Sequence, residues 1–125
     1  MYKTFLLVGI GGALGSTLRY FLGLFLKSFS PVFPLGTLAA NLLGCVCMGL
    51  VMGFSERFNW FSVEWRLFLA SGFCGGFTTF SAFAFENIRL LQTGDYKTFI
   101  LYTFSSLVVT FLAVVLGLML AKLSW

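Results

Sequence analysis

The sequence predicts an all-α membrane protein with four transmembrane helices, and three observations support this fold class. Hydrophobic residues make up 59% of the chain and charged residues only 10%, which leaves too few polar side chains to cover a soluble surface. Four apolar stretches each reach the roughly 20 residues that a helix needs to cross a bilayer. Little chain remains between them, so a single four-span domain is expected over residues 1–125.

The four spans are expected at about residues 4–27, 35–54, 65–91 and 98–121. The first is too long for a removable signal peptide and contains Arg19. Pro31 and Pro34 break the chain after the first span, and Gly94 breaks it after the third. The mixed-charge segment 55–64 separates the second span from the third. An even number of spans places both termini on one side of the membrane.

The third span contains the run GFCGGFTTFSAFAFE at residues 72–86, which is unfavourable for a continuous helix. Gly75 and Gly76 each cost about 1 kcal/mol relative to alanine in a helix interior. The threonines and the serine that follow compete for backbone hydrogen bonds. The third helix is therefore expected to break near its middle, at the glycine pair. A break at membrane depth is tolerated only inside protein or beside a cavity, and its free carbonyls can bind Na⁺.

The positive charges that flank the spans are almost balanced between the two sides. Four lie with the termini and the second loop, and three lie on the opposite side: Lys3, Arg57, Arg66 and Lys122 against Lys27, Arg89 and Lys97. The excess of Lys and Arg normally sets the orientation of a membrane protein. Two interpretations remain open. Either folding overrides a weak bias, or the chain inserts in both orientations and pairs with an inverted copy.

Small residues indicate how the helices pack. Three glycine pairs have the GxxxG spacing that lets helix backbones approach closely, within or between subunits: Gly11–Gly15, Gly49–Gly53 and Gly72–Gly76. The cysteines Cys45, Cys47 and Cys74 are interpreted as small buried hydrophobic residues. The CVC spacing of the first two is also compatible with a metal, but neither a histidine nor a second pair accompanies it.

Polar residues inside the spans indicate two helix faces. The second span carries Thr37 and Asn41 one turn apart, on one face. The fourth carries Tyr102, Ser106 and Thr110 at intervals of four residues, which makes a slowly drifting stripe of hydroxyls. Single polar residues of this kind usually form hydrogen bonds between helices. A stripe of three that faces an amide favours a lined pathway instead.

The chemistry of these side chains favours an anion. Hydroxyls and the Asn41 amide donate hydrogen bonds, and Glu86 lies near the end of its span rather than deep within it. Phe80 and Phe83 project to one side of the third span, where the positive edges of their rings can face an anion. Core packing is the ordinary interpretation of a pair among 17 phenylalanines. The broken helix beside them favours the pathway.

Three runs together resemble the Fluc/CrcB family of fluoride channels: GGALGSTLRY (11–20), PLGTLAANLLG (34–44) and GFCGGFTTFSAFAFE (72–86). The resemblance covers nearly the whole chain, and its third run is the most specific. It implies a fluoride-selective channel, not an enzyme, which exports fluoride passively through two pores. It also implies an inverted, dual-topology homodimer of four-helix subunits with a structural Na⁺ at its centre.

The resemblance also implies roles for individual residues. Its fluoride pore would be lined by Asn41, Phe80, Ser81, Phe83, Tyr102, Ser106 and Thr110. Arg19 and Glu86 would lie towards the vestibules, and the backbone carbonyls of Gly75 and Thr78 would bind Na⁺. Fluoride, bilayer lipid and a second copy of the chain are the expected partners, with no nucleic acid. The expected location is the bacterial plasma (inner) membrane.

Other classes of membrane protein fit the sequence less well. A small multidrug-type transporter, the main alternative, needs a membrane-embedded carboxylate for proton exchange, and the charge well inside the first span is Arg19. An enzyme is not favoured, because the chain has no histidine and the third-span hydroxyls have no evident base. A purely structural subunit leaves the broken span unexplained.

Overall fold

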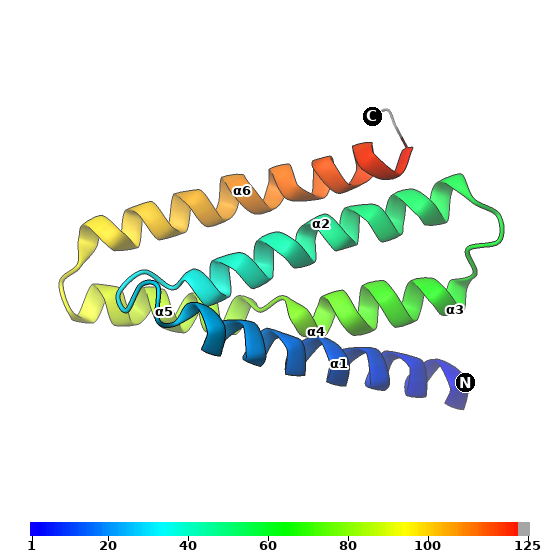
Figure 1. The fold of residues 1–125 in the computed structure, drawn as a ribbon, viewed down its shortest axis with the longest axis horizontal. Coiled ribbons are helices and arrows are strands. Elements are labelled where there is room, and N and C mark those ends of the chain that lie inside the picture. Colours follow the sequence, from blue (N-terminus) through cyan, green and yellow to red (C-terminus); the bar gives the residue numbers. More distant parts are fainter. Residues whose placement is uncertain (123–125) are drawn as a thin grey trace.

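The computed structural model describes residues 1–122, and these residues form four long helical segments that run antiparallel (Figure 1). The first, second and fourth segments are the single helices α1 (Tyr2–Leu26), α2 (Leu35–Arg57) and α6 (Tyr96–Lys122). The third segment is divided into α3 (Val63–Arg66), η1 (Leu67–Cys74), α4 (Gly75–Phe77) and α5 (Phe80–Gln92). All four segments are long and apolar enough to cross a membrane, which confirms the predicted spans.

The connections begin and end where local sequence favours them. Pro34 precedes the first residue of α2, and the Ser62 hydroxyl accepts a hydrogen bond from the Trp65 amide at the start of α3. Gly94 adopts a positive φ of 79° between α5 and α6, a conformation that glycine allows without strain. The N-terminus and the end of α6 lie at the same end of the bundle (Figure 1), as an even number of spans requires.

Close contacts at glycines join the helices into two packed pairs, α1 with η1 and α4, and α2 with α6. Helix α1 packs along η1 and α4, where a Cβ on Gly72 would lie 3.1 Å from the Cα of Gly11. A Cβ on Gly76 would lie 2.9 Å from the Cα of Gly12. Helix α2 packs along α6, where a Cβ on Gly49 would lie 2.9 Å from the Cα of Gly117. These backbones are too close for any side chain between them.

All three predicted GxxxG pairs are therefore contacts between helices within one chain. A Cβ on Gly15 would meet the Phe73 carbonyl of η1, and one on Gly53 would lie 2.6 Å from the Ala121 side chain of α6. The structure thus confirms that these glycines serve helix packing.

The break in the third segment lies near its middle, as predicted, but not at the glycine pair. Gly75 has helical torsion angles, with φ of −62° and ψ of −38°, and Gly76 continues the helix. The backbone becomes extended at Thr78 and Thr79, whose ψ values are 156° and 124°. The prediction placed the break three residues too early, because Gly76 is helical where α4 packs against α1.

A second irregularity in the third segment was not predicted. Residues Leu67–Cys74 form a π-helix, in which the Gly75 amide donates to the Ala70 carbonyl five residues earlier. Turns of this kind are rare and are often found beside functional sites. The third segment therefore departs from α-helical geometry on both sides of the glycine pair.

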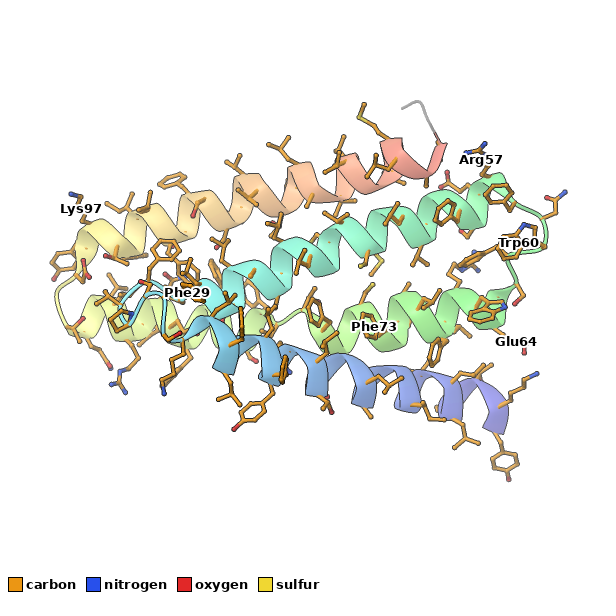
Figure 2. All side chains as sticks on the ribbon, viewed as in Figure 1. Phe29, Arg57, Trp60, Glu64, Phe73 and Lys97 are labelled. Carbon is orange, nitrogen blue, oxygen red and sulfur yellow. The ribbon has the colours of Figure 1, made fainter. Side chains whose placement is uncertain are left out.

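Several charged side chains lie at the two ends of the bundle. Figure 2 shows Arg57, Trp60 and Glu64 at one end and Lys97 at the other. Lys3 and Glu64 form an ion pair of 2.6 Å between the start of α1 and α3. These positions agree with loops that lie outside the hydrocarbon region of a bilayer.

Candidate functional site

Asn41 of α2 holds the broken backbone of the third segment. Its Nδ2 donates to the Thr79 carbonyl at 3.1 Å, and its Oδ1 accepts from the Thr79 amide at 2.8 Å. One side chain thus satisfies both polar groups of the residue at which the helix is interrupted. Since unpaired backbone groups are costly in a membrane, this pairing makes the break tolerable there.

At the same break, two backbone carbonyls lose the amides that would pair with them in a continuous helix. The Gly75 carbonyl would normally accept from the Thr79 amide, which instead donates to Asn41. The Thr78 carbonyl would normally accept from the Ala82 amide, which donates to the Thr79 hydroxyl at 3.2 Å. The break therefore releases the two carbonyls that the family resemblance implies as Na⁺ ligands, although it lies beyond the glycine pair. Their role as ligands stays a prediction.

Arg19 reaches the break from α1. Its Nε donates to the Gly76 carbonyl at 3.1 Å, another carbonyl at the end of α4. The guanidinium thus combines a backbone contact with a positive charge inside the bundle. Cations placed in this way inside a membrane protein are usually functional.

Glu86 of α5 is surrounded by hydroxyl donors. The Thr37 hydroxyl donates to its Oε2 at 2.9 Å, and the Tyr102 hydroxyl donates to its Oε1 at 2.9 Å. These contacts join α2, α5 and α6 through one carboxylate. They also occupy the Tyr102 hydroxyl, which the sequence predicts as a pore donor.

A wide pocket of about 540 Å³ opens beside this network. Its lining includes the basic residues Arg19, Lys27 and Arg89, together with Glu86 as its carboxylate. Both predicted vestibule residues therefore lie in one hollow. Because the positive charges exceed the negative, the pocket attracts anions.

A smaller pocket of about 220 Å³ lies beyond Thr79, which lines both hollows. Its lining comprises Asn41, Cys45, Thr78, Thr79, Phe80, Phe83, Ser106, Leu107 and Thr110. None of these described residues carries a charge. The pocket therefore combines an amide, hydroxyls, a thiol and aromatic rings, and we refer to it as the inner pocket.

Aromatic rings form a row that begins with Phe80 and Phe83 in the inner pocket and continues beyond it. The ring centroids of Phe80 and Phe83 are 5.7 Å apart with an angle of 45° between their planes. Phe83 in turn lies 5.2 Å from the ring of Tyr102, and Tyr102 meets Phe33 edge to face at 5.5 Å. Tilted rings of this kind expose positive edges as well as negative faces.

Ser106 is the one buried hydroxyl within residues 1–122 that lacks a hydrogen-bond partner. Its side chain is 5% exposed, and it lines the inner pocket. Thr110, one turn further along α6, donates instead to the Ser106 carbonyl at 2.6 Å. An unpaired buried hydroxyl is unusual, and its place in the lining makes Ser106 a candidate donor to an ion in the pocket.

The inner pocket brings together five of the seven residues that the family resemblance implies for the pore: Asn41, Phe80, Phe83, Ser106 and Thr110. Two others lie outside its lining. Ser81 is exposed, with its hydroxyl 3.2 Å from that of Thr79, and Tyr102 is fully buried against Glu86. The roles of all seven residues stay predictions.

The structure also reveals participants that the sequence reasoning missed. Thr79 caps α5, pairs with Asn41 and lines both pockets. Threonine is a preferred residue at the start of a helix, so the sequence contained a signal for this role of Thr79.

The cysteines are less buried than expected. Cys74 is buried, but Cys45 and Cys47 are only half-buried, and Cys45 lines the inner pocket.

Comparisons with known proteins agree with this geometry. Residues 6–118 match the family described as CrcB-like protein, Camphor Resistance (CrcB). The chain is 43% identical to the fluoride-specific ion channel FluC of Azobacteroides pseudotrichonymphae, over 98% of each protein. It is 44% identical to the protein of that name from Chlorobium phaeobacteroides, over 98% of this chain and 95% of the relative. For the Rhizobium leguminosarum protein of that name, identity is 47% over 90% of this chain and 91% of the relative.

Proposed function

The chain belongs to the CrcB family, and we propose that it is a fluoride-selective channel of the bacterial plasma membrane. The channel conducts passively, so fluoride leaves the cell down its own gradient. The inner pocket is the observation that carries this assignment. It offers the Ser106 hydroxyl, the second N–H of the Asn41 amide and ring edges to an anion, and no carboxylate lines it.

Conduction follows from the two pockets in sequence. The basic residues of the wide pocket raise the local concentration of anions beside Thr79. An ion that enters the inner pocket exchanges water for the Ser106 hydroxyl and the edges of Phe80 and Phe83. Uncharged donors bind the ion firmly enough to strip its water and weakly enough to release it. A full positive charge in the pocket would hold fluoride too tightly.

The working unit in this proposal is a dimer of two inverted copies. In a single chain Phe80 is 77% exposed, and Gly75 and Ser81 are also exposed beside the broken backbone. Irregular backbone is not found facing lipid, because hydrocarbon cannot pair its polar groups. A second copy that covers this face removes the exposure. Two copies then provide two inner pockets and two pores.

A Na⁺ ion at the centre of that dimer fits the released carbonyls. Gly75 and Thr78 have lost their helical donors, and carbonyl oxygens of unwound helices bind Na⁺ in other membrane proteins. In two inverted copies, the Gly75 and Thr78 carbonyls of both chains would hold the ion, which would join the subunits and offset the repulsion between these carbonyl dipoles.

The small multidrug-type transporter is not favoured. The relatives described above are named as fluoride channels. Such a transporter also needs a free carboxylate at its binding site, whereas Glu86 already accepts hydrogen bonds from Thr37 and Tyr102.

Fluoride efflux from liposomes tests the proposed function directly. Purified protein is reconstituted into vesicles loaded with potassium fluoride. Valinomycin carries K⁺ out with the anion, so no membrane potential builds up and anion movement limits the rate. We expect rapid fluoride efflux and no measurable chloride efflux from parallel vesicles loaded with chloride. Equal rates for the two ions, or no fluoride movement in correctly assembled protein, would refute the assignment.

Dual orientation predicts labelling of each end of the bundle from both sides of one membrane. Gln92→Cys and Asn59→Cys, placed on exposed residues at opposite ends, are made separately in a background without the three native cysteines. An impermeant maleimide applied to intact cells should label a substantial fraction of each variant. The remainder should react only after the membrane is opened, because near-balanced charge gives neither orientation a strong preference. Labelling of only one variant in intact cells would contradict the inverted dimer.

A further inference from the structure

Cys45 occupies a position in the inner pocket that its residue type does not suggest. It lies one helical turn after Asn41 on α2, and both side chains line that pocket. Cys47 lies two residues further on, about 200° around the helix, and is outside the described lining. The CVC run therefore places one thiol in the pocket and directs the other elsewhere.

A second observation at the same pocket points to a bound partner. The Ser106 hydroxyl is buried and unpaired within residues 1–122, and it lines the hollow together with Cys45. Ser106 and Thr110 are one turn apart on α6, as Asn41 and Cys45 are on α2. Two packed helices thus present facing pairs of small polar side chains. The arrangement resembles a donor-lined path more closely than an apolar core.

We propose that Cys45 is a pore-lining residue, whose thiol completes a donor subsite with the Ser106 hydroxyl and is a site of covalent block. This inference rests on the proposed channel function and extends it to a residue without an assigned role. A thiol is a weak hydrogen-bond donor, so it adds binding for a desolvated anion without trapping it. The thiol also makes the path sensitive to small sulfenylating reagents.

The blocking reaction is a thiol–disulfide type exchange with methyl methanethiosulfonate. The Cys45 thiolate attacks the sulfenyl sulfur of the reagent, and the sulfur–sulfur bond of the reagent breaks. Methanesulfinate leaves with the bonding electrons, and the thiol proton passes to water. The new methyl disulfide replaces a donor with an apolar group and fills part of a pocket of about 220 Å³.

The test compares fluoride efflux before and after treatment of the assembled channel with this reagent. Wild-type protein should lose most of its flux, with the adduct located at Cys45 by peptide mass spectrometry. Cys47→Ser should behave as the wild type in both respects. In Cys45→Ser the ratio of treated to untreated flux should stay near one, because the reactive sulfur is absent.

A second variant separates the donor role from the block. Cys45→Val keeps a small apolar side chain and removes the donor, so untreated flux should fall by about twofold, the lower end of what one hydrogen bond contributes. Cys47→Val is the matched control and should conduct as the wild type.

Three results would overturn the inference: an equal block in Cys45→Ser, a full Cys45 adduct with unchanged flux, or an adduct at Cys47 with none at Cys45. Untreated wild-type protein that does not conduct fluoride refutes the proposed function instead. The adduct map then still decides whether Cys45 is accessible, so the two failures are distinguishable.

Discussion

Phe80→Ile and Phe83→Ile, made one at a time, should each lower the fluoride flux of the assembled protein by at least about tenfold. This factor corresponds to about 1.4 kcal/mol in the conduction barrier. Both rings line the inner pocket, and their centroids are 5.7 Å apart. Isoleucine is large and apolar but lacks the positive ring edge that faces an anion. Flux should therefore fall although a large apolar side chain still lines the pocket.

Stability and conduction are separable for these variants. Phe80 is 77% exposed in the single chain, so its replacement removes little packing within the subunit. Phe83 contacts Phe80 and Tyr102, and its replacement should cost about 0.5–1.5 kcal/mol for each aromatic pair that is lost. Efflux is therefore normalised to protein that elutes as assembled channel.

Phe85→Ile is the matched control for the aromatic pair. Phe85 lies on the same helix and is 61% exposed, but it is not among the residues that line the inner pocket. Its variant should conduct as the wild type. If all three isoleucine variants conduct normally, the rings serve packing alone and the inner pocket is not the anion path.

Gly75→Val should shift the proposed dimer towards monomer, although a single chain has room for the substitution. Within residues 1–122 a Cβ on Gly75 meets only the Ala70 carbonyl, at an ordinary 3.7 Å. In the proposed dimer this glycine faces the partner beside the Na⁺ site. Overpacking typically costs about 1–3 kcal/mol, and a two-fold interface contains the substitution twice. The dimer should weaken by at least about tenfold.

The control for Gly75→Val is Gly9→Val in α1. Gly9 is also an exposed helical glycine, with no described atom within 4 Å of a Cβ. Both variants add the same bulk to an open position, so they affect the single chain similarly. Size-exclusion chromatography with light scattering in detergent measures the outcome. Dimers of equal stability in both variants would place the subunit contact and the cation site away from Gly75.

Much of the fold was predictable because membrane helices have strong local signals. Every segment was predicted to within a few residues from its apolar length, from the prolines between residues 28 and 34, and from Gly94. The position of the break was harder. Glycine weakens isolated helices, but Gly76 is held in helical form by its packing against Gly12. The π-helix of residues Leu67–Cys74 has no comparable sequence signal.

The candidate site was predictable by helix face but not by hydrogen-bond partner. Spacing placed Thr37 and Asn41 on one face of α2, and both side chains do contact the third segment. It did not reveal that Asn41 would pair with Thr79, since that contact joins residues 38 apart. Cys45 was missed because cysteine in an apolar helix usually reports only burial.

The Asn41 bridge also has a consequence for the thermodynamics of ion binding. Straightening the third segment requires both hydrogen bonds to Thr79 to be broken, so the interrupted conformation is maintained before any ion arrives. The released carbonyls and the walls of the inner pocket are consequently preorganised. In the proposed channel, an ion would lose its hydration shell there without also having to order the protein, and preorganisation of this kind lowers the entropic cost of binding. Asn41 would then contribute to ion affinity through the rigidity of its neighbours, separately from any contact that its amide makes with the ion.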